Sequence, residues 1–179
     1  MIYTLVTGPS EPVTLTDVKS HSRISHDAED TYLTMLISAA RQYAEHYCQT
    51  SIGEQTWSYT GANWPDQLAH PPLASVDFAK YYISDVLTTW DSSGYRVDTS
   101  VPGKLVPVTE FPSVDDRPDA VQIQYGCGKS ATDSVKLACL IMVSHWYEIR
   151  EPVVTGTIVA KVPWSAHALL DSERWGDYS

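Results

Sequence analysis

The chain has 179 residues, a hydrophobic share of 43% and a formal net charge of −10. This length and composition fit one globular domain, or one domain with an appended segment. The acidic balance, with no two consecutive Lys or Arg residues anywhere, excludes a surface built to neutralise nucleic-acid phosphates.

Two helices are predicted near the start of the chain, after a short extended segment. Thr14 offers a capping hydroxyl with Asp17 three residues later, which predicts a helix over about residues 14–22. A longer helix is predicted over about residues 28–49, because acidic residues load its first turn and apolar residues then recur at helical spacing. Its apolar stripe includes Leu33, Leu36, Ile37 and Ala40.

A strand-rich insertion is expected from about residue 55 to residue 126, where Pro, Gly, Asp and Ser separate short β-rich runs. A hairpin turn is predicted at residues 91–94, which read Asp-Ser-Ser-Gly. The expected strands are Thr56–Tyr59, Val76–Ile83, Tyr95–Val97 and Val121–Tyr125.

Another long helix is predicted over about residues 132–150, with Val135, Cys139, Met142 and Trp146 on one face. Neither long helix is stable alone at this length, so their apolar stripes should pack together. The expected fold class is therefore α+β: a small helical bundle with a β-strand insertion between two long helices and a C-terminal extension. Residues 1–152 would form the core.

The remaining residues, 153–179, are predicted to be a linker followed by a C-terminal docking arm. The arm would start at Pro163, a favoured first helical residue, after a flexible stretch around Gly156. A short apolar-faced helix has too little core of its own, which makes it a candidate docking peptide. The alternative is that it folds back onto its own domain. The candidate docking residues are Pro163, Trp164, Leu169, Leu170 and Trp175.

No catalytic, cofactor or metal site is predicted. Residues 126–130, Gly-Cys-Gly-Lys-Ser, resemble the end of a phosphate-binding loop, but Ile123 stands where the first glycine of that motif belongs. His46 and Cys48 have the wrong spacing to ligate a metal from one helix face. A nucleotide-binding enzyme is therefore only a distant alternative.

The cellular setting is expected to be a bacterial cytoplasm at synthesis. The three cysteines are odd in number and form no close pair, which is typical of a reducing compartment. The first residues lack the pattern of a signal peptide, and no apolar run approaches the roughly 20 residues of a membrane span, so no membrane partner is expected.

The order and spacing of several segments resemble the head-tail connector (adaptor) family of long-tailed bacteriophages and related gene-transfer particles. At the start, the resemblance is carried by Pro12–Lys19, Arg23-Ile24, Asp27–Asp30 and Leu36–Arg41. Toward the end, it is carried by Gly126–Gly128, by His145–Glu151 and by Pro163 with Ala168-Leu169-Leu170. The family often has Pro where this chain has Ser134 and an aromatic residue where it has Cys127.

This resemblance implies a structural virion protein located in the neck, at the head-tail interface, and not an enzyme. It implies a homo-oligomeric ring, commonly a dodecamer, between the portal protein and a stopper or tail-completion protein. DNA would pass through the ring during packaging and ejection without specific binding. A tail terminator or another neck protein is the alternative within the same biology.

Overall fold

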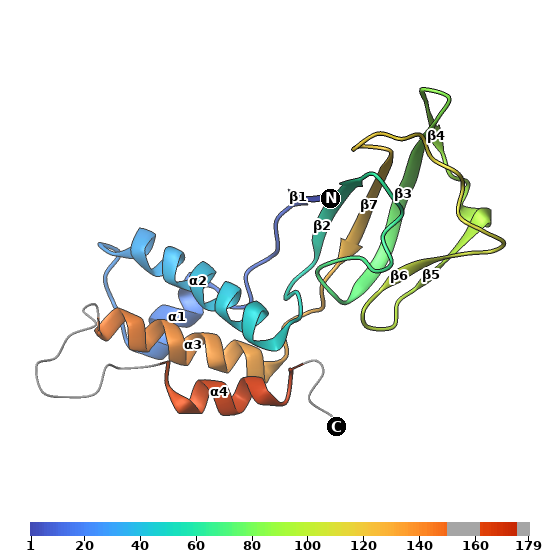
Figure 1. The fold of residues 1–179 in the computed structure, drawn as a ribbon. Helices are drawn as coiled ribbons and strands as arrows, with labels where there is room; N and C mark the ends of the chain where they lie inside the picture. Colours follow the sequence, from blue (N-terminus) through green and yellow to red (C-terminus); the bar gives the residue numbers. More distant parts are fainter. Residues whose placement is uncertain (150–161, 175–179) are drawn as a thin grey trace, which may run out of the picture. The chain divides into compact units, whose positions relative to one another are not determined.

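The computed structural model of the chain describes residues 1–149 and 162–174. These residues form two compact units, each built from two separate parts of the chain (Figure 1). The β unit comprises residues 1–10 and 54–129, and the helical unit comprises residues 11–53 and the chain from residue 130 onward. The division that the sequence suggested after residue 152 falls outside the described residues, and the observed units divide the chain at other positions.

Side-chain capping bonds mark the start of two helices of the helical unit. Helix α1 (Leu15–Ser22) opens with a capping box: the Asp17 backbone N–H donates to Thr14 Oγ1 at 3.1 Å, and the Thr14 backbone N–H donates to Asp17 Oδ2 at 2.9 Å. Helix α2 (Asp30–Cys48) carries an acidic residue in its first turn. At the start of α3 (Asp133–Glu148), the Val135 N–H donates to Thr132 Oγ1 at 3.4 Å.

The core of the helical unit lies where α2 packs against α3. Ala40, Ala44 and Ala138 are fully buried, and their small side chains let the helix backbones approach closely. Trp146 is half-buried at the edge of this core. The larger buried side chains are Leu33, Leu36, Ile37, Val135, Cys139 and Met142.

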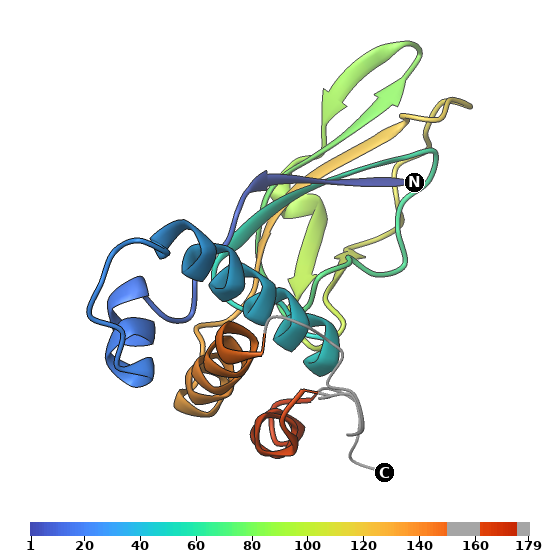
Figure 2. The same cartoon turned by 90° about the vertical axis from the view of Figure 1, so that its left-hand side faces the viewer.

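The β unit is built on a five-stranded antiparallel sheet with the order β1-β2-β7-β3-β4 (Figures 1 and 2). A second sheet pairs β5 with β6. The five strands are β1 (Ile2–Thr7), β2 (Gln55–Gly61), β7 (Val121–Cys127), β3 (Leu73–Ile83) and β4 (Val86–Thr89), and the smaller sheet consists of β5 (Tyr95–Asp98) and β6 (Lys104–Pro107).

Burial in the central strand β7 alternates along the chain, as expected of a sheet with one covered face. Ile123 is fully buried, and its register partners Tyr59 on β2 and Ala79 on β3 are buried on the same face. Trp90 and Leu105 complete this second core. The structure thus confirms the predicted α+β class with a strand-rich insertion between two long helices.

The predicted hairpin turn at residues 91–94 is wrong. That segment contains a single 3-10 turn, η1 (Ser92–Gly94), in which the Ser93 N–H donates to Asp91 Oδ1 at 2.8 Å. It connects β4 and β5, which belong to different sheets. The hairpin turn lies instead at Ser84 and Asp85, between β3 and β4, where both residues have positive φ (53° and 61°).

Candidate docking site

The predicted docking segment forms a helix, α4 (Trp164–Asp171), that packs against α2 and α3 within the helical unit. Ala166 and Leu170 are fully buried in the core of that unit, and Leu169 is half-buried against it. Side chains at positions 166 and 170 share one helix face because they are four residues apart. The short helix is therefore stabilised by the apolar surface of its longer neighbours.

Polar contacts attach the outer part of α4 to α2. Tyr43 Oη and His167 Nε2 share a hydrogen bond of 2.7 Å, and the Tyr47 hydroxyl donates to Asp171 Oδ1 at 2.5 Å. The His167 ring stacks on Tyr47 with centroids 5.0 Å apart. The bond to Asp171 raises the pKa of the Tyr47 phenol, so Tyr47 remains a neutral donor.

The turn after α4 is also attached to the helical unit. The Thr132 hydroxyl, at the start of α3, donates to Glu173 Oε1 at 2.8 Å. The Arg174 guanidinium lies 5.5 Å from the centre of the Tyr47 ring, a cation–π distance. Contacts from α2 and α3 thus reach the described end of the segment.

The structure distributes the five candidate docking residues unequally between core and surface. Trp164, at the first position of α4, is 82% exposed, and Pro163 before it is half-buried. Leu170 is inside the core and Leu169 at its edge, while Trp175 lies outside the described residues. Helix α4 therefore folds back onto its own domain, as the alternative interpretation of the sequence expected.

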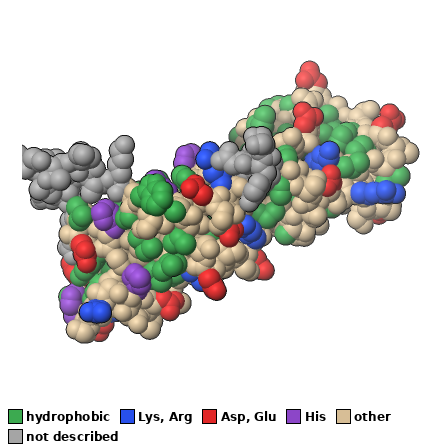
Figure 3. All heavy atoms as spheres, turned by 90° about the horizontal axis from the view of Figure 1, so that it is seen from below, with side chains coloured by type: hydrophobic (Ala, Val, Ile, Leu, Met, Phe, Trp, Pro, Cys, Tyr) green, Lys and Arg blue, Asp and Glu red, His purple; other side chains and the backbone are tan. Residues whose placement is uncertain are grey.

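Hydrophobic side chains are also exposed on the surface of the helical unit. Seen from below, the side on which α4 lies in Figure 1, this unit presents a group of hydrophobic side chains to solvent (Figure 3). Trp164 is the most exposed large hydrophobic residue of the described helical unit, followed by Met35. A large exposed indole suits a docking role, because Trp can bury a large area while its N–H keeps a polar partner.

The glycine-rich segment at residues 126–130 is a turn between strand β7 and helix α3. Gly128 has a φ of 93°, which favours glycine, and its N–H donates to the Pro72 carbonyl at 2.9 Å. A phosphate-binding loop directs such amides toward the ligand. Here the Gly128 amide instead donates to a carbonyl within the β unit.

The three cysteines, at positions 48, 127 and 139, are buried and free. Burial raises the pKa of the Cys139 thiol to about 12, so this thiol stays protonated and unreactive at neutral pH. Within residues 1–149 and 162–174, no group of three or more His, Cys, Asp and Glu side chains is arranged to hold a metal ion. Among the same residues, no helix is both long and apolar enough to cross a membrane.

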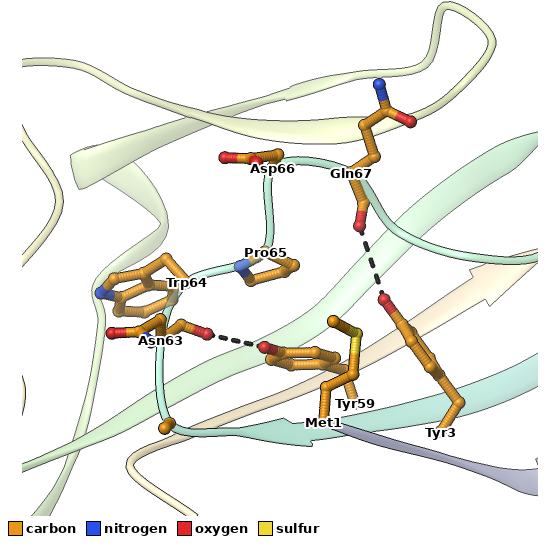
Figure 4. Close-up of a pocket in the computed structure, with 9 residues that line it drawn as sticks. Met1, Tyr3, Tyr59, Asn63, Trp64, Pro65, Asp66 and Gln67 are labelled. Atoms are coloured by element: carbon orange, nitrogen blue, oxygen red, sulfur yellow. Dashed lines mark hydrogen bonds between the residues drawn. The ribbon is translucent and has the colours of Figure 1, made fainter. Parts of the chain in front are cut away.

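A pocket of about 480 Å³ lies on the β unit beside the start of β1 (Figure 4). The Tyr59 hydroxyl donates to the Asn63 carbonyl at 2.7 Å, and the Tyr3 hydroxyl donates to the Gln67 carbonyl at 3.5 Å. Burial raises the pKa of both phenols, which keeps them neutral donors. Both hydroxyls hold the loop after β2 in place, so these two polar groups of the pocket serve the fold.

The sequence of the chain matches the family described as "Phage gp6-like head-tail connector protein" over residues 12–101, half of its length. No match is found among curated proteins. Among solved structures, the fold is similar to a chain in the neck of an empty gene transfer agent (GTA) particle computed with C6 symmetry. The TM-score is 0.77 and the sequence identity is 18%, and the match covers 97% of this chain and 95% of that chain.

Two further solved structures have the same fold. One is a chain of the virion of the native GTA particle, with a TM-score of 0.76. The other is a chain of the neck of the native GTA particle computed with C12 symmetry, with a TM-score of 0.70. Both are 18% identical in sequence to this chain and match over 97% of it and 95% of the other chain.

Proposed function

We propose that the chain, which belongs to the family of phage gp6-like head-tail connector proteins, is the adaptor subunit of a particle's neck. In this role it assembles into a ring between the portal protein and a stopper or tail-completion protein. The family match supports this proposal most strongly. The fold adds support, because it is similar to chains from the necks of GTA particles computed with C6 and C12 symmetry.

The role is mechanical rather than catalytic. A connector must hold two large assemblies together and leave a channel for DNA. A formal charge of −10 per copy suits this task, because an acidic or neutral channel wall lets a polyanion pass without sticking. Twelve copies in a ring would repeat each weak contact with the portal and so make the attachment firm through multivalency.

The portal contact is assigned to the start of α4, at Pro163 and Trp164. Trp164 is 82% exposed, whereas Ala166 and Leu170 on the same helix are fully buried and fix the helix to the subunit. A docking residue on an anchored helix loses little conformational freedom on binding, because the helix is ordered beforehand. The Trp164 indole would enter an apolar pocket on the portal.

A binding assay with portal-containing heads that lack the connector tests this proposal. The purified chain should sediment with such heads, and Trp164→Ala should reduce the bound amount at least about tenfold, as expected for a buried aromatic anchor. Met35→Ala is the matched control, because Met35 is also exposed, at 57%, on the helical unit. Failure of the unaltered chain to bind heads would refute the proposed function. Equal binding by both variants would refute only the role of Trp164.

A further inference from the structure

Large apolar side chains are exposed at both outer edges of the five-stranded sheet. At one edge, β1 exposes Ile2 (65%), Leu5 (45%) and Val6 (52%). At the opposite edge, the hairpin of β3 and β4 exposes Ile83, Val86 and Leu87, with Val86 the most exposed at 61%. In the described part of the chain, β1 pairs only with β2, and β4 pairs only with β3.

These edges carry few of the charged residues that usually prevent contact with another chain, although β1 has a register shift between Leu5 and Thr7 and β4 is only four residues long. Natural proteins protect edge strands with charged residues or proline. Strand β1 contains neither, and residues 1–10 hold no Asp, Glu, Lys or Arg. The β3–β4 tip, residues 83–89, contains one charged residue, Asp85, and Arg117 Nη1 lies 3.9 Å from its carboxylate. Both edges are therefore suited to burial.

The β3–β4 hairpin is also held rigid. Its turn residues, Ser84 and Asp85, both adopt positive φ without the help of glycine. The Asp115 carboxylate accepts hydrogen bonds from the backbone N–H groups of both residues, at 2.9 and 2.8 Å. The Arg117 guanidinium lies 3.6 Å from the centre of the Tyr82 ring. This bracing pre-organises an apolar projection and so lowers the cost of ordering it on binding.

We infer that the β3–β4 hairpin of one copy packs against the β1 edge of the next copy in the ring. This inference rests on the proposed function, which requires the ring. A closed ring uses heterologous interfaces, so each copy must present two unlike surfaces that fit each other. The two sheet edges meet this requirement. Each copy has a formal charge of −10, so neighbouring copies repel each other. A contact at these edges keeps that repulsion low, because few charged residues lie there.

The contact is side-chain packing rather than one sheet continued around the ring. Neighbouring strands of a sheet rotate by about 20–25° on average, so the first and fifth strands of this sheet differ by roughly 80–100°. Figure 2 shows β1 and the β3–β4 hairpin running in clearly different directions. In a ring of twelve, neighbouring copies are rotated by only about 30°, which does not bring such strands close to parallel, so they form no regular ladder across the joint. Ile83 and Val86, which lie opposite each other on one face of the hairpin, would instead pack against Val6 and its apolar neighbours on β1 of the next copy.

Cysteine cross-linking in assembled particles tests the inference, because all three native cysteines are buried. Particles are prepared with Val6→Cys, with Val86→Cys and with both substitutions together, then mildly oxidised and separated on denaturing gels. The double variant should form a ladder of linked copies, while each single variant should stay monomeric. Dimers of a single variant, or its linkage to another neck component, would overturn the inference. So would a monomeric double variant in particles whose neck still holds the ring.

A second pair of variants applies if the cysteine variants do not enter particles. Val86→Asp should prevent incorporation into the neck, because it places a charge in the contact. Val108→Asp, the same change at a residue of the same unit with similar exposure (54%), should leave incorporation intact. Equal incorporation of both would overturn the inference. Absence of the unaltered chain from the neck would instead refute the proposed function.

Discussion

At the scale of single residues, Leu36 on α2 and Met142 on α3 are buried side chains of the helical core, exposed by 6% and 0% respectively. Replacing either by Ala should lower the free energy of unfolding by about 2–5 kcal/mol, because it removes buried methylene groups and leaves a cavity. Chemical denaturation followed by far-UV circular dichroism measures the loss.

Met35→Ala is the control for these core variants, because Met35 neighbours Leu36 but is 57% exposed. Its effect should stay within about 0.5 kcal/mol. Losses below about 1 kcal/mol for both Leu36→Ala and Met142→Ala would contradict the packing of α2 against α3.

His70 gives the β unit a pH-dependent stability. Its ring stacks on Trp57 with centroids 3.7 Å apart, and burial lowers its pKa below the ordinary value of 6.5. The folded state therefore binds fewer protons than the unfolded state between these two pKa values, and stability rises with pH in that window. The contribution of His70 should be fully present above pH 6.5 and should fall as the pH drops below it.

Measuring the unfolding free energy on both sides of pH 6.5 tests this expectation. His70→Asn should flatten the profile, because Asn does not titrate and tolerates the positive φ of 63° at this position. A profile that His70→Asn does not alter would rule out this role of His70.

At the scale of elements, α4 divides its side chains between two tasks. Leu170 is fully buried, so Leu170→Ala should cost about 2–5 kcal/mol of stability. Trp164→Ala should change stability by no more than about 0.5 kcal/mol, because Trp164 is 82% exposed, while reducing binding to heads. Denaturation and head binding, measured on both variants, separate the tasks. A destabilising Trp164→Ala would show that this residue serves the fold instead.

The fold class could be predicted because its signals are local. A capping box at Thr14 and Asp17 and apolar residues at helical spacing are properties of neighbouring residues, and they identify the helices on both sides of the insertion. The alternation of buried residues in β7 is a local pattern of the same kind. These patterns required no knowledge of tertiary contacts.

The remaining features depend on contacts between distant residues. The turn at Ser84 and Asp85 contains no glycine, and the carboxylate that holds it, Asp115, lies 30 residues beyond Asp85. The sequence left open whether the last helix docks on a partner or folds back, because the deciding bonds join residues 124 positions apart, such as Tyr43 and His167. The exposed apolar edges of β1 and β4 were missed, since edge strands can be recognised only once the strand order is known.

At the scale of the whole molecule, the formal charge of −10 predicts a weak affinity for DNA. Affinity for DNA comes mainly from basic side chains that neutralise phosphates, and the sequence has no two consecutive basic residues. The purified chain should therefore retain little DNA at physiological salt in a filter-binding or mobility-shift assay. Submicromolar binding that weakens with added salt would contradict an acidic or neutral channel wall.

The central claim is that copies of this chain form a ring in the neck, between portal and tail. Electron microscopy of intact particles carrying a label on this chain tests the claim most directly. The expected result is a closed ring of labelled copies around the DNA channel, directly below the portal. Particles in which the label lies elsewhere, or whose neck is complete without this chain, would contradict it.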